Sequence, residues 1–175
     1  MTAALMYPGC VKGLVIYEPA LFNLLFEDKE SFSSVAEILS VERTVNGMLM
    51  AGKRDEASRH FVDYWSGADA FDRLPDWQRN AIMDRMEKVL MDFDAAFRNR
   101  NFLAEYGEIK SPALFLYGLD SPSTTRRITQ LLAATLPNAE VRGILGYGHM
   151  APITHSEEVN RVIENFLKYL FKEKI

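Results

Sequence analysis

Several features that define particular classes of protein are scarce or absent in this sequence. The single cysteine, Cys10, cannot form a disulfide within the chain, which fits a reducing compartment. No apolar run approaches the length of a membrane-spanning helix. The first basic residue is Lys12, whereas a secretory signal begins with positive charge followed by a long apolar stretch. We therefore expect a cytoplasmic protein that has no membrane partner.

Clusters of basic residues and of metal ligands are also lacking. The 20 Lys and Arg residues are outnumbered by 24 Asp and Glu residues, and without a basic patch we expect no nucleic-acid partner. The three histidines, His60, His149 and His155, are dispersed and form no metal-ligand spacing with Cys10. The sequence has no complete dinucleotide-binding or phosphate-binding motif, so it implies no cofactor and no metal.

What the sequence does contain is typical of a folded globular protein. Hydrophobic residues make up 48% of the chain and charged residues 25%, with both signs interspersed, which argues against a disordered or fibrous protein. A length of 175 residues allows one domain with a substantial core, or a small core with a helical extension.

Short runs rich in Val, Ile and Leu predict three strands. The segment 11–17 suits a strand buried on both faces of a parallel sheet, and the segments 113–117 and 140–145 also have strand character. Helical periodicity follows the second strand as far as Leu136, and it follows the third strand as far as Leu170. Strands that alternate with helices through short loops predict an α/β fold with an open parallel sheet.

The pattern between the first and second predicted strands is helical throughout. Residues 22–101 contain no convincing strand, and glycines and Pro75 divide them into separate helices. We therefore expect an all-helical insert at 22–101 and a core formed by 1–21 together with 102–175. The aromatic and methionine side chains of the insert are first of all the core of its helices.

The segment GYGHMAPITHSEEVN, residues 146–160, carries the strongest functional signal. It places His149 just beyond a predicted strand, between a glycine-rich turn and an amphipathic helix, where open α/β sheets bind ligands. A neutral imidazole at such a position can act as the general base of acyl transfer. The alternative is a loop histidine that only hydrogen-bonds a neighbour. We expect His60 and His155, which lie in or at the start of predicted helices, to be structural.

The segment GLDSPSTTRRITQLLAATLPNAEVRGILGYGHMAPITHSEEVNRVIENFL resembles the last two strands and helices of the α/β-hydrolase family. In that family a histidine in a G-x-G-H-type turn is the third member of the catalytic triad, and His149 occupies that place. VKGLVIYEPALF resembles the strand after the nucleophile helix, and the helical insert, which contains FVDYWSGADAFDRLP, is similar to the family's cap domain. The resemblance implies the C-terminal part of an α/β-hydrolase fold, with three parallel strands, flanking helices and a helical cap at 22–101.

The family's serine nucleophile lies on a G-x-S-x-G elbow, and the 175 residues contain no such pattern. The opening MTAALMYPG resembles the later part of the helix that follows the elbow, so the resemblance implies a serine located before Met1. We expect this chain to be inactive by itself, as a natural truncation, a misassigned start or one half of a split enzyme. Cys10 is a poor replacement nucleophile, because it precedes its strand and His149 follows the end of its own.

The resemblance leaves two candidates for the triad acid. The family's usual acid stands three residues after the glycine that follows the strand at 113–117, and Ser121 occupies that place here, with Asp120 one residue early. A minority of members, including those that resemble haloalkane dehalogenases, carry the acid at the end of the strand after the nucleophile helix, where Glu18 stands. The pattern favours Glu18, with Asp120 as the rival. If they have no catalytic role, Glu18 is a hydrogen-bonded carboxylate at the end of a strand, and Asp120 is an aspartate that forms a turn or caps a helix.

Two functions follow from this sequence. The first is the C-terminal portion of a hydrolase that cleaves a small, apolar, ester-like substrate by a Ser-His-acid mechanism, with some cap side chains lining the pocket. The second is a noncatalytic remnant that binds or oligomerises, because a three-stranded sheet leaves an edge open to another chain. The expected partners are therefore a small-molecule substrate, and a second copy of this chain or a separate N-terminal half.

Overall fold

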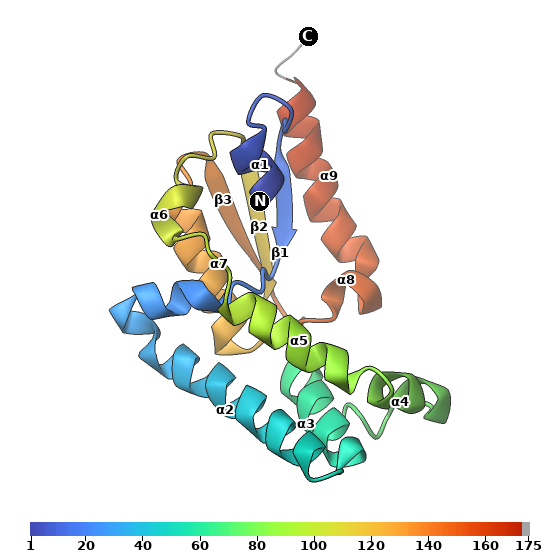
Figure 1. The fold of residues 1–175 in the computed structure, drawn as a ribbon. Coiled ribbons are helices and arrows are strands. Elements are labelled where there is room, and N and C mark those ends of the chain that lie inside the picture. Colours follow the sequence, from blue (N-terminus) through green and yellow to red (C-terminus); the bar gives the residue numbers. More distant parts are fainter. Residues whose placement is uncertain (173–175) are drawn as a thin grey trace. The chain divides into compact units, whose positions relative to one another are not determined.

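The structure, a computed structural model, describes residues 1–172 and divides into two compact units. The first, which we call the sheet unit, consists of Met1–Ala20 and the chain from Arg100 onward. The second, the helical unit, is Leu21–Asn99. Figure 1 shows the elements of both units along the chain.

Three parallel strands form the sheet: β1 (Leu14–Tyr17), β2 (Ala113–Gly118) and β3 (Ala139–Ile144). Their spatial order is β1-β2-β3, so the chain adds each strand beside the preceding one. The register places Ala113 opposite both Leu14 and Ala139. The predicted α/β class, with three parallel strands and flanking helices, is confirmed.

The expectation that the first strand is buried on both faces was wrong. In β1, Val15 is 36% exposed and the other three residues are only partly buried. The reason is its position, because among the described residues β1 has a strand on one side only. The strand that is buried on both faces is β2, which lies between the other two.

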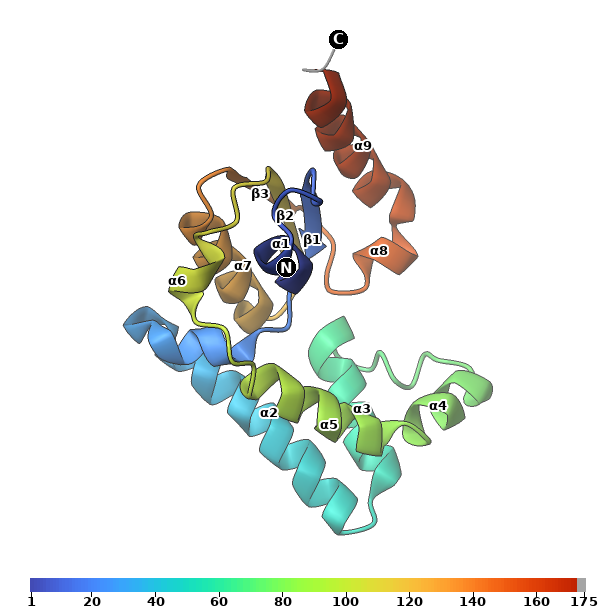
Figure 2. The same ribbon diagram turned by 45° about the horizontal axis from the view of Figure 1, so that its top comes forward.

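Helices cover both faces of the sheet. After β2 comes α7 (Ser123–Thr135), which buries Ile128 and Leu132 completely. After β3 come the short α8 (Ala151–Thr154) and the long α9 (Ser156–Lys172). Figure 2 shows α7 and α9 on opposite sides of the sheet. Two further short helices belong to this unit, α1 (Thr2–Met6) and α6 (Leu103–Tyr106).

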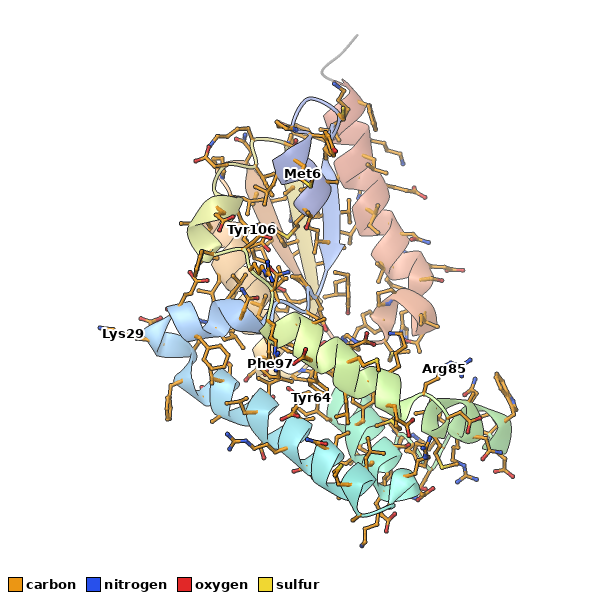
Figure 3. The ribbon with its side chains drawn as sticks, viewed as in Figure 1. Met6, Lys29, Tyr64, Arg85, Phe97 and Tyr106 are labelled. Carbon is orange, nitrogen blue, oxygen red and sulfur yellow. The ribbon has the colours of Figure 1, made fainter. Side chains whose placement is uncertain are left out.

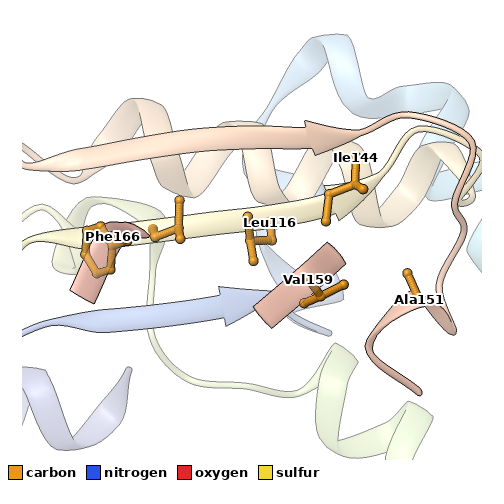
Figure 4. Packing of buried hydrophobic residues seen from close by; sticks show 6 residues of the cluster. Leu116, Ile144, Ala151, Val159 and Phe166 are labelled. Carbon is orange, nitrogen blue, oxygen red and sulfur yellow. The ribbon is translucent and has the colours of Figure 1, made fainter. Parts of the chain in front are cut away.

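The side chains of β2 alternate between these faces, as pleated strands require. Leu114 and Leu116 face α9, where they form a buried cluster with Ile144, Ala151, Val159 and Phe166 (Figure 4). Tyr17 and Tyr147 pack against this cluster. The core of the sheet unit therefore extends to the carboxyl ends of the strands.

The helical unit contains no strand among its residues, as the sequence predicts. Its elements are two 3-10 helices, η1 (Phe22–Glu27) and η2 (Lys29–Ser31), and the α-helices α2 (Phe32–Met50), α3 (Arg54–Ser66), α4 (Asp76–Met83) and α5 (Met86–Phe97).

Aromatic rings form much of the core of the helical unit. The rings of Phe22 and Phe97 lie 5.2 Å apart between centroids, and Phe93 contacts both. The Tyr64 hydroxyl donates to Glu37 at 2.9 Å and so connects α3 to α2; Tyr64 and Phe97 are labelled in Figure 3. None of the helices within residues 1–172 combines the length and apolar character needed to cross a membrane.

Candidate active site

Glu18 directly follows β1 and has an unusual backbone conformation. Its φ is +43°, in the left-handed region that residues other than glycine rarely adopt, at a cost of about 1–3 kcal/mol. Its N–H donates to the Leu116 carbonyl at 3.0 Å, which continues the parallel ladder one residue beyond β1. The side chain is completely buried. This turn directs the carboxylate of Glu18 to the carboxyl end of β2.

His149 lies in the turn that follows β3, and its imidazole contacts this carboxylate. Nδ1 of His149 is 2.7 Å from Oε2 of Glu18, although 131 residues separate the two in sequence. The side chain of His149 is 33% exposed, so the ring lies at the surface while its acidic partner is buried. The structure thus brings these two predicted site residues together at the carboxyl ends of the parallel strands, where open α/β sheets bind ligands.

The turn that carries His149 is held against the ends of β1 and β2. The Tyr17 hydroxyl donates to the Gly148 carbonyl at 2.7 Å, and the Asp120 N–H donates to the Tyr147 carbonyl at 3.0 Å. Gly118 lies so close to this turn that a Cβ built on it would be 2.2 Å from the Tyr147 carbonyl oxygen. Only glycine allows this close approach between the end of β2 and the turn that carries His149.

The Glu18 carboxylate accepts hydrogen bonds on both oxygens. Oε1 accepts from the Gly118 N–H at 2.8 Å and from the buried Ser121 hydroxyl, and Oε2 contacts His149. Burial by itself raises the pKa of Glu18, but the hydrogen bonds from His149, Ser121 and Gly118 outweigh burial and lower it. The carboxylate is therefore ionised near neutral pH, despite having no exposure to solvent.

An ionised carboxylate can only accept, so Nδ1 of His149 must be the donor in this pair. In the neutral imidazole this tautomer places the ring's lone pair on Nε2, the atom that would accept a proton from a nucleophile. Burial and the Glu18 charge also raise the pKa of the neighbouring Tyr17, which keeps its hydroxyl protonated as the donor to Gly148. This arrangement would allow Nε2 of His149 to act as a general base.

The other sequence candidates make no hydrogen bond to the Glu18–His149 pair. Asp120 lies beside the turn that carries His149, but it is exposed and its carboxylate makes no hydrogen bond within residues 1–172. His60 belongs to α3 in the helical unit, and His155 contacts the Thr154 hydroxyl at 2.8 Å and the Tyr147 ring. Cys10 is exposed and precedes β1, whereas Glu18 follows it. Within the described part of the chain, no three His, Cys, Asp or Glu residues are grouped to hold a metal ion.

Sequence reasoning did not assign roles to Ser121, Gly118 and Tyr17. The signal for Ser121 was present, since it stands three residues after Gly118, where the resembled family usually carries its acid. The sequence alone showed only that an acid is missing there. It did not show that the hydroxyl at this position donates to an acid 103 residues earlier in the chain.

Sequence comparison finds no matching family model and no match among curated proteins. Solved structures do match. A bromoperoxidase from Bacillus anthracis is 20% identical over 95% of this chain, with a TM-score of 0.64. The enol-lactonase from Burkholderia xenovorans is 15% identical over 95%, with a TM-score of 0.62. MGS-M2, an α/β-hydrolase enzyme from a deep-sea metagenome library, is 16% identical over 98%, with a TM-score of 0.66.

These similarities establish the fold. The chain has an α/β-hydrolase fold over part of that fold's length, as the resemblance predicts. Nearly all of this chain is matched in each comparison, but it spans only 63%, 60% and 60% of the respective structures.

Proposed function

We propose that this chain is the histidine-bearing part of an α/β-hydrolase that cleaves a small, apolar, ester-like substrate. The observation that carries the proposal is the 2.7 Å contact between His149 Nδ1 and the buried Glu18 carboxylate at the carboxyl ends of the strands. Similarity to an enol-lactonase supports an ester bond as the target, because a lactone is a cyclic ester. In this proposal the helical unit, Leu21–Asn99, is the cap that shapes the substrate pocket.

In the proposed reaction, Nε2 of His149 takes the proton of a serine hydroxyl as the serine oxygen bonds to the ester carbonyl carbon. The bond between the carbonyl carbon and the alkoxide oxygen then breaks, and the imidazolium gives this proton to that oxygen. The alcohol is released and the acyl group remains on the serine. Water, activated by the same nitrogen, hydrolyses the acyl-serine to the acid and restores the serine. Glu18 remains ionised throughout, because its role is to orient the ring and stabilise the imidazolium.

The serine of this proposal lies outside the 175 residues, which contain no G-x-S-x-G elbow. It would come from sequence upstream in the same gene or from a separate N-terminal half. The limited share of the matching structures that the chain spans is consistent with either source. The isolated chain should therefore not hydrolyse esters, and the assembled enzyme should.

Glu18 takes the role of the triad acid in this proposal, and Ser121 is a positioning residue. The buried Ser121 hydroxyl and the Gly118 N–H hold one carboxylate oxygen and leave the other for His149. Ser121 thus occupies the position at which α/β-hydrolases usually carry the triad acid. Its hydroxyl instead donates a hydrogen bond to Glu18, which follows a different strand. Asp120 is the matched control for Glu18. This residue is next to Ser121 in sequence, but its exposed carboxylate makes no hydrogen bond in the described chain.

The first experiment uses the chain as it is and follows the imidazole of His149 by ¹⁵N and ¹H NMR. We expect a downfield Nδ1–H resonance that is lost in Glu18→Gln and kept in Asp120→Asn. A resonance that survives Glu18→Gln and disappears in Asp120→Asn would reverse the assignment of the acid.

The second experiment assays p-nitrophenyl acetate hydrolysis by the longest open reading frame that contains this chain, or by the chain mixed with a separately encoded elbow-bearing half. Glu18→Gln should lower kcat by about 10³–10⁴-fold, and Asp120→Asn should leave it unchanged. Hydrolysis by the 175-residue chain alone, abolished by His149→Ala, would refute the external serine.

A noncatalytic module remains the second candidate function, and the exposure of the β1 edge favours it. Val15 lies on a strand with no charged residue and with a partner strand on one side only, within the described chain. Such an edge is suited to pairing with another chain. If no upstream serine exists and no elbow-bearing half associates with the chain, binding through β1 becomes the better account.

A further inference from the structure

The opposite edge of the sheet is formed by β3, whose outer main-chain groups face away from β2. The Asn138 carbonyl accepts from the Ala113 N–H at 2.9 Å, and the Ile144 carbonyl accepts from the Leu119 N–H at 3.0 Å. Main-chain groups alternate in direction along a strand, so the even-numbered residues of β3 bond to β2. The N–H and C=O groups of Ala139, Val141 and Gly143 therefore point outward, where the described chain has no further strand.

The side chains of this edge are a mixture of charge and apolar surface. Glu140 and Arg142 project on the face that carries α9 and form an ion pair at 3.1 Å. They border a groove between β3 and α9 whose lining includes Phe166, Tyr169 and the highly exposed Leu145. On the other face, Val141 is 43% exposed.

A charged edge strand can serve to prevent pairing with other chains. The order of charges on β3 argues for a different role, because Glu-Val-Arg is self-complementary in an antiparallel pair. With Val141 on a two-fold axis, Glu140 lies opposite Arg142 of the partner subunit, and Arg142 lies opposite Glu140 of the partner subunit. Antiparallel strands place directly opposed side chains on the same face, so both pairs can form.

The same register satisfies the outward main-chain groups. Val141 would exchange both of its hydrogen bonds with Val141 of the partner subunit, and Ala139 and Gly143 would exchange theirs with each other across the axis. An axis shifted to Gly143 would place Arg142 opposite an isoleucine. An axis shifted to Ala139 would place Pro137, which has no N–H, opposite Val141. Of these three registers, the one centred on Val141 pairs both the charges and the outward main-chain groups of Ala139, Val141 and Gly143.

We infer that β3 is a homodimer interface at which a second copy of this chain adds its β3 in antiparallel orientation. The two three-stranded sheets would join into one continuous sheet, with both copies of α9 on the same face. The two grooves beside α9 would meet there, so that their apolar lining is buried together with the charge pairs. The inference does not depend on hydrolysis, because β3 is the edge opposite to β1 and Glu18.

The test measures the mass of the full chain by sedimentation velocity, with single and double charge reversals. Wild type should be a dimer. Glu140→Arg and Arg142→Glu each place like charges opposite one another, so each should weaken self-association on the order of tenfold. The double variant Glu140→Arg/Arg142→Glu restores opposite charges and should be a dimer again. Circular dichroism and thermal unfolding verify that each variant is folded.

In the decisive experiment, the two single variants are mixed and the product is identified by native mass spectrometry. One variant presents two arginines and the other two glutamates, so the mixture should form a heterodimer that neither variant forms with itself. The control reverses the exposed ion pair Glu164–Lys168 on α9, as Glu164→Arg and Lys168→Glu separately, and should leave the mass unchanged.

A folded wild-type monomer would overturn the inference and show that the charges keep the edge unpaired. A dimer that is insensitive to both single variants, or a mixture without a heterodimer, would overturn it as well. These outcomes are read from mass alone, so they are independent of the ester assay that tests the proposed function.

Discussion

The two units of this protein each contain a prominent acid–base pair, in opposite surroundings. In the sheet unit, the Glu18 carboxylate is completely buried and His149 is its partner. In the helical unit, the Asp72 carboxylate is about half exposed and pairs with Arg59, which also contacts Asp55 at 3.3 Å. In both cases the pKa of the carboxyl is lowered, by hydrogen bonds that outweigh burial at Glu18 and by the Arg59 hydrogen bond at Asp72.

The difference lies in what each pair is connected to. Water can replace Arg59 around Asp72, so that pair is a replaceable surface contact. The Glu18 side chain is buried, and its hydrogen-bond partners come from the end of β2, from the loop after β2 and from the turn after β3. Removing this carboxylate leaves its buried hydrogen-bond donors without an acceptor, which is the general reason that a buried polar group is costly to lose. A similar direction of pKa shift therefore has different consequences in the two units.

Glu18→Ala should have the largest effect on stability. It leaves the buried Ser121 hydroxyl and the Gly118 N–H without their acceptor, and we expect a loss of about 3 kcal/mol in the free energy of unfolding. Urea titration followed by far-UV circular dichroism reports both units, whereas fluorescence of Trp65 and Trp77 follows the helical unit only. The loss should appear in the dichroism. A Glu18→Ala variant as stable as wild type would contradict the buried network.

Gly118→Ala should have the next largest effect. The added methyl group would overlap the Tyr147 carbonyl and displace the turn that carries His149, at a cost of about 1–3 kcal/mol. The matched control is Gly47→Ala in α2, where a Cβ meets no atom within 4 Å. Alanine is the better helix former, so this control should stabilise by about 0.5–1 kcal/mol. Equal effects at the two glycines would show that the turn can move away from β2.

The pH dependence of stability should further distinguish the Glu18–His149 pair from the Asp72–Arg59 pair. The pKa of Glu18 is lowered from 4.5, so its contribution to stability is fully present above that value and is lost as the pH falls below it. We expect the urea midpoint of wild type to fall in this range, and the fall to be smaller in Glu18→Gln. Adding salt should have little effect on the contribution of Glu18 to this pH dependence, because its carboxylate is buried. An identical pH profile for the two proteins would contradict a lowered pKa.

The sequence was informative where the pattern is local. β2 and β3 are close to the predicted segments because strand character is continuous there. His149 could be proposed as a site residue because its glycine-rich turn is a short motif. The burial of β1 was predicted wrongly, since a run of apolar residues does not show how many strands lie beside it. The α/β-hydrolase fold was predicted from motifs alone and is confirmed by solved structures.

The arrangement of the candidate site depended on contacts that sequence spacing does not encode. Glu18 was favoured over Asp120 only by analogy, and the contact with His149 depends on a left-handed backbone at Glu18 that nothing in VKGLVIYEP indicates. The hydrogen bond from Ser121 joins residues 103 positions apart. Such contacts arise from the register of β1 and β2, which places residues 18 and 118 at the same end of the sheet.

Asp72→Asn should have the smallest effect, and it tests the other half of the comparison. The substitution removes the charge facing Arg59 but leaves both side chains in water, so the urea midpoint should stay within error at physiological salt. At low ionic strength a small loss should become measurable, and it should vanish again as salt is added. Arg59 keeps Asp55 as an alternative partner, which limits the loss further. If Asp72→Asn destabilised the protein as much as Glu18→Ala, burial would not be what distinguishes the two pairs.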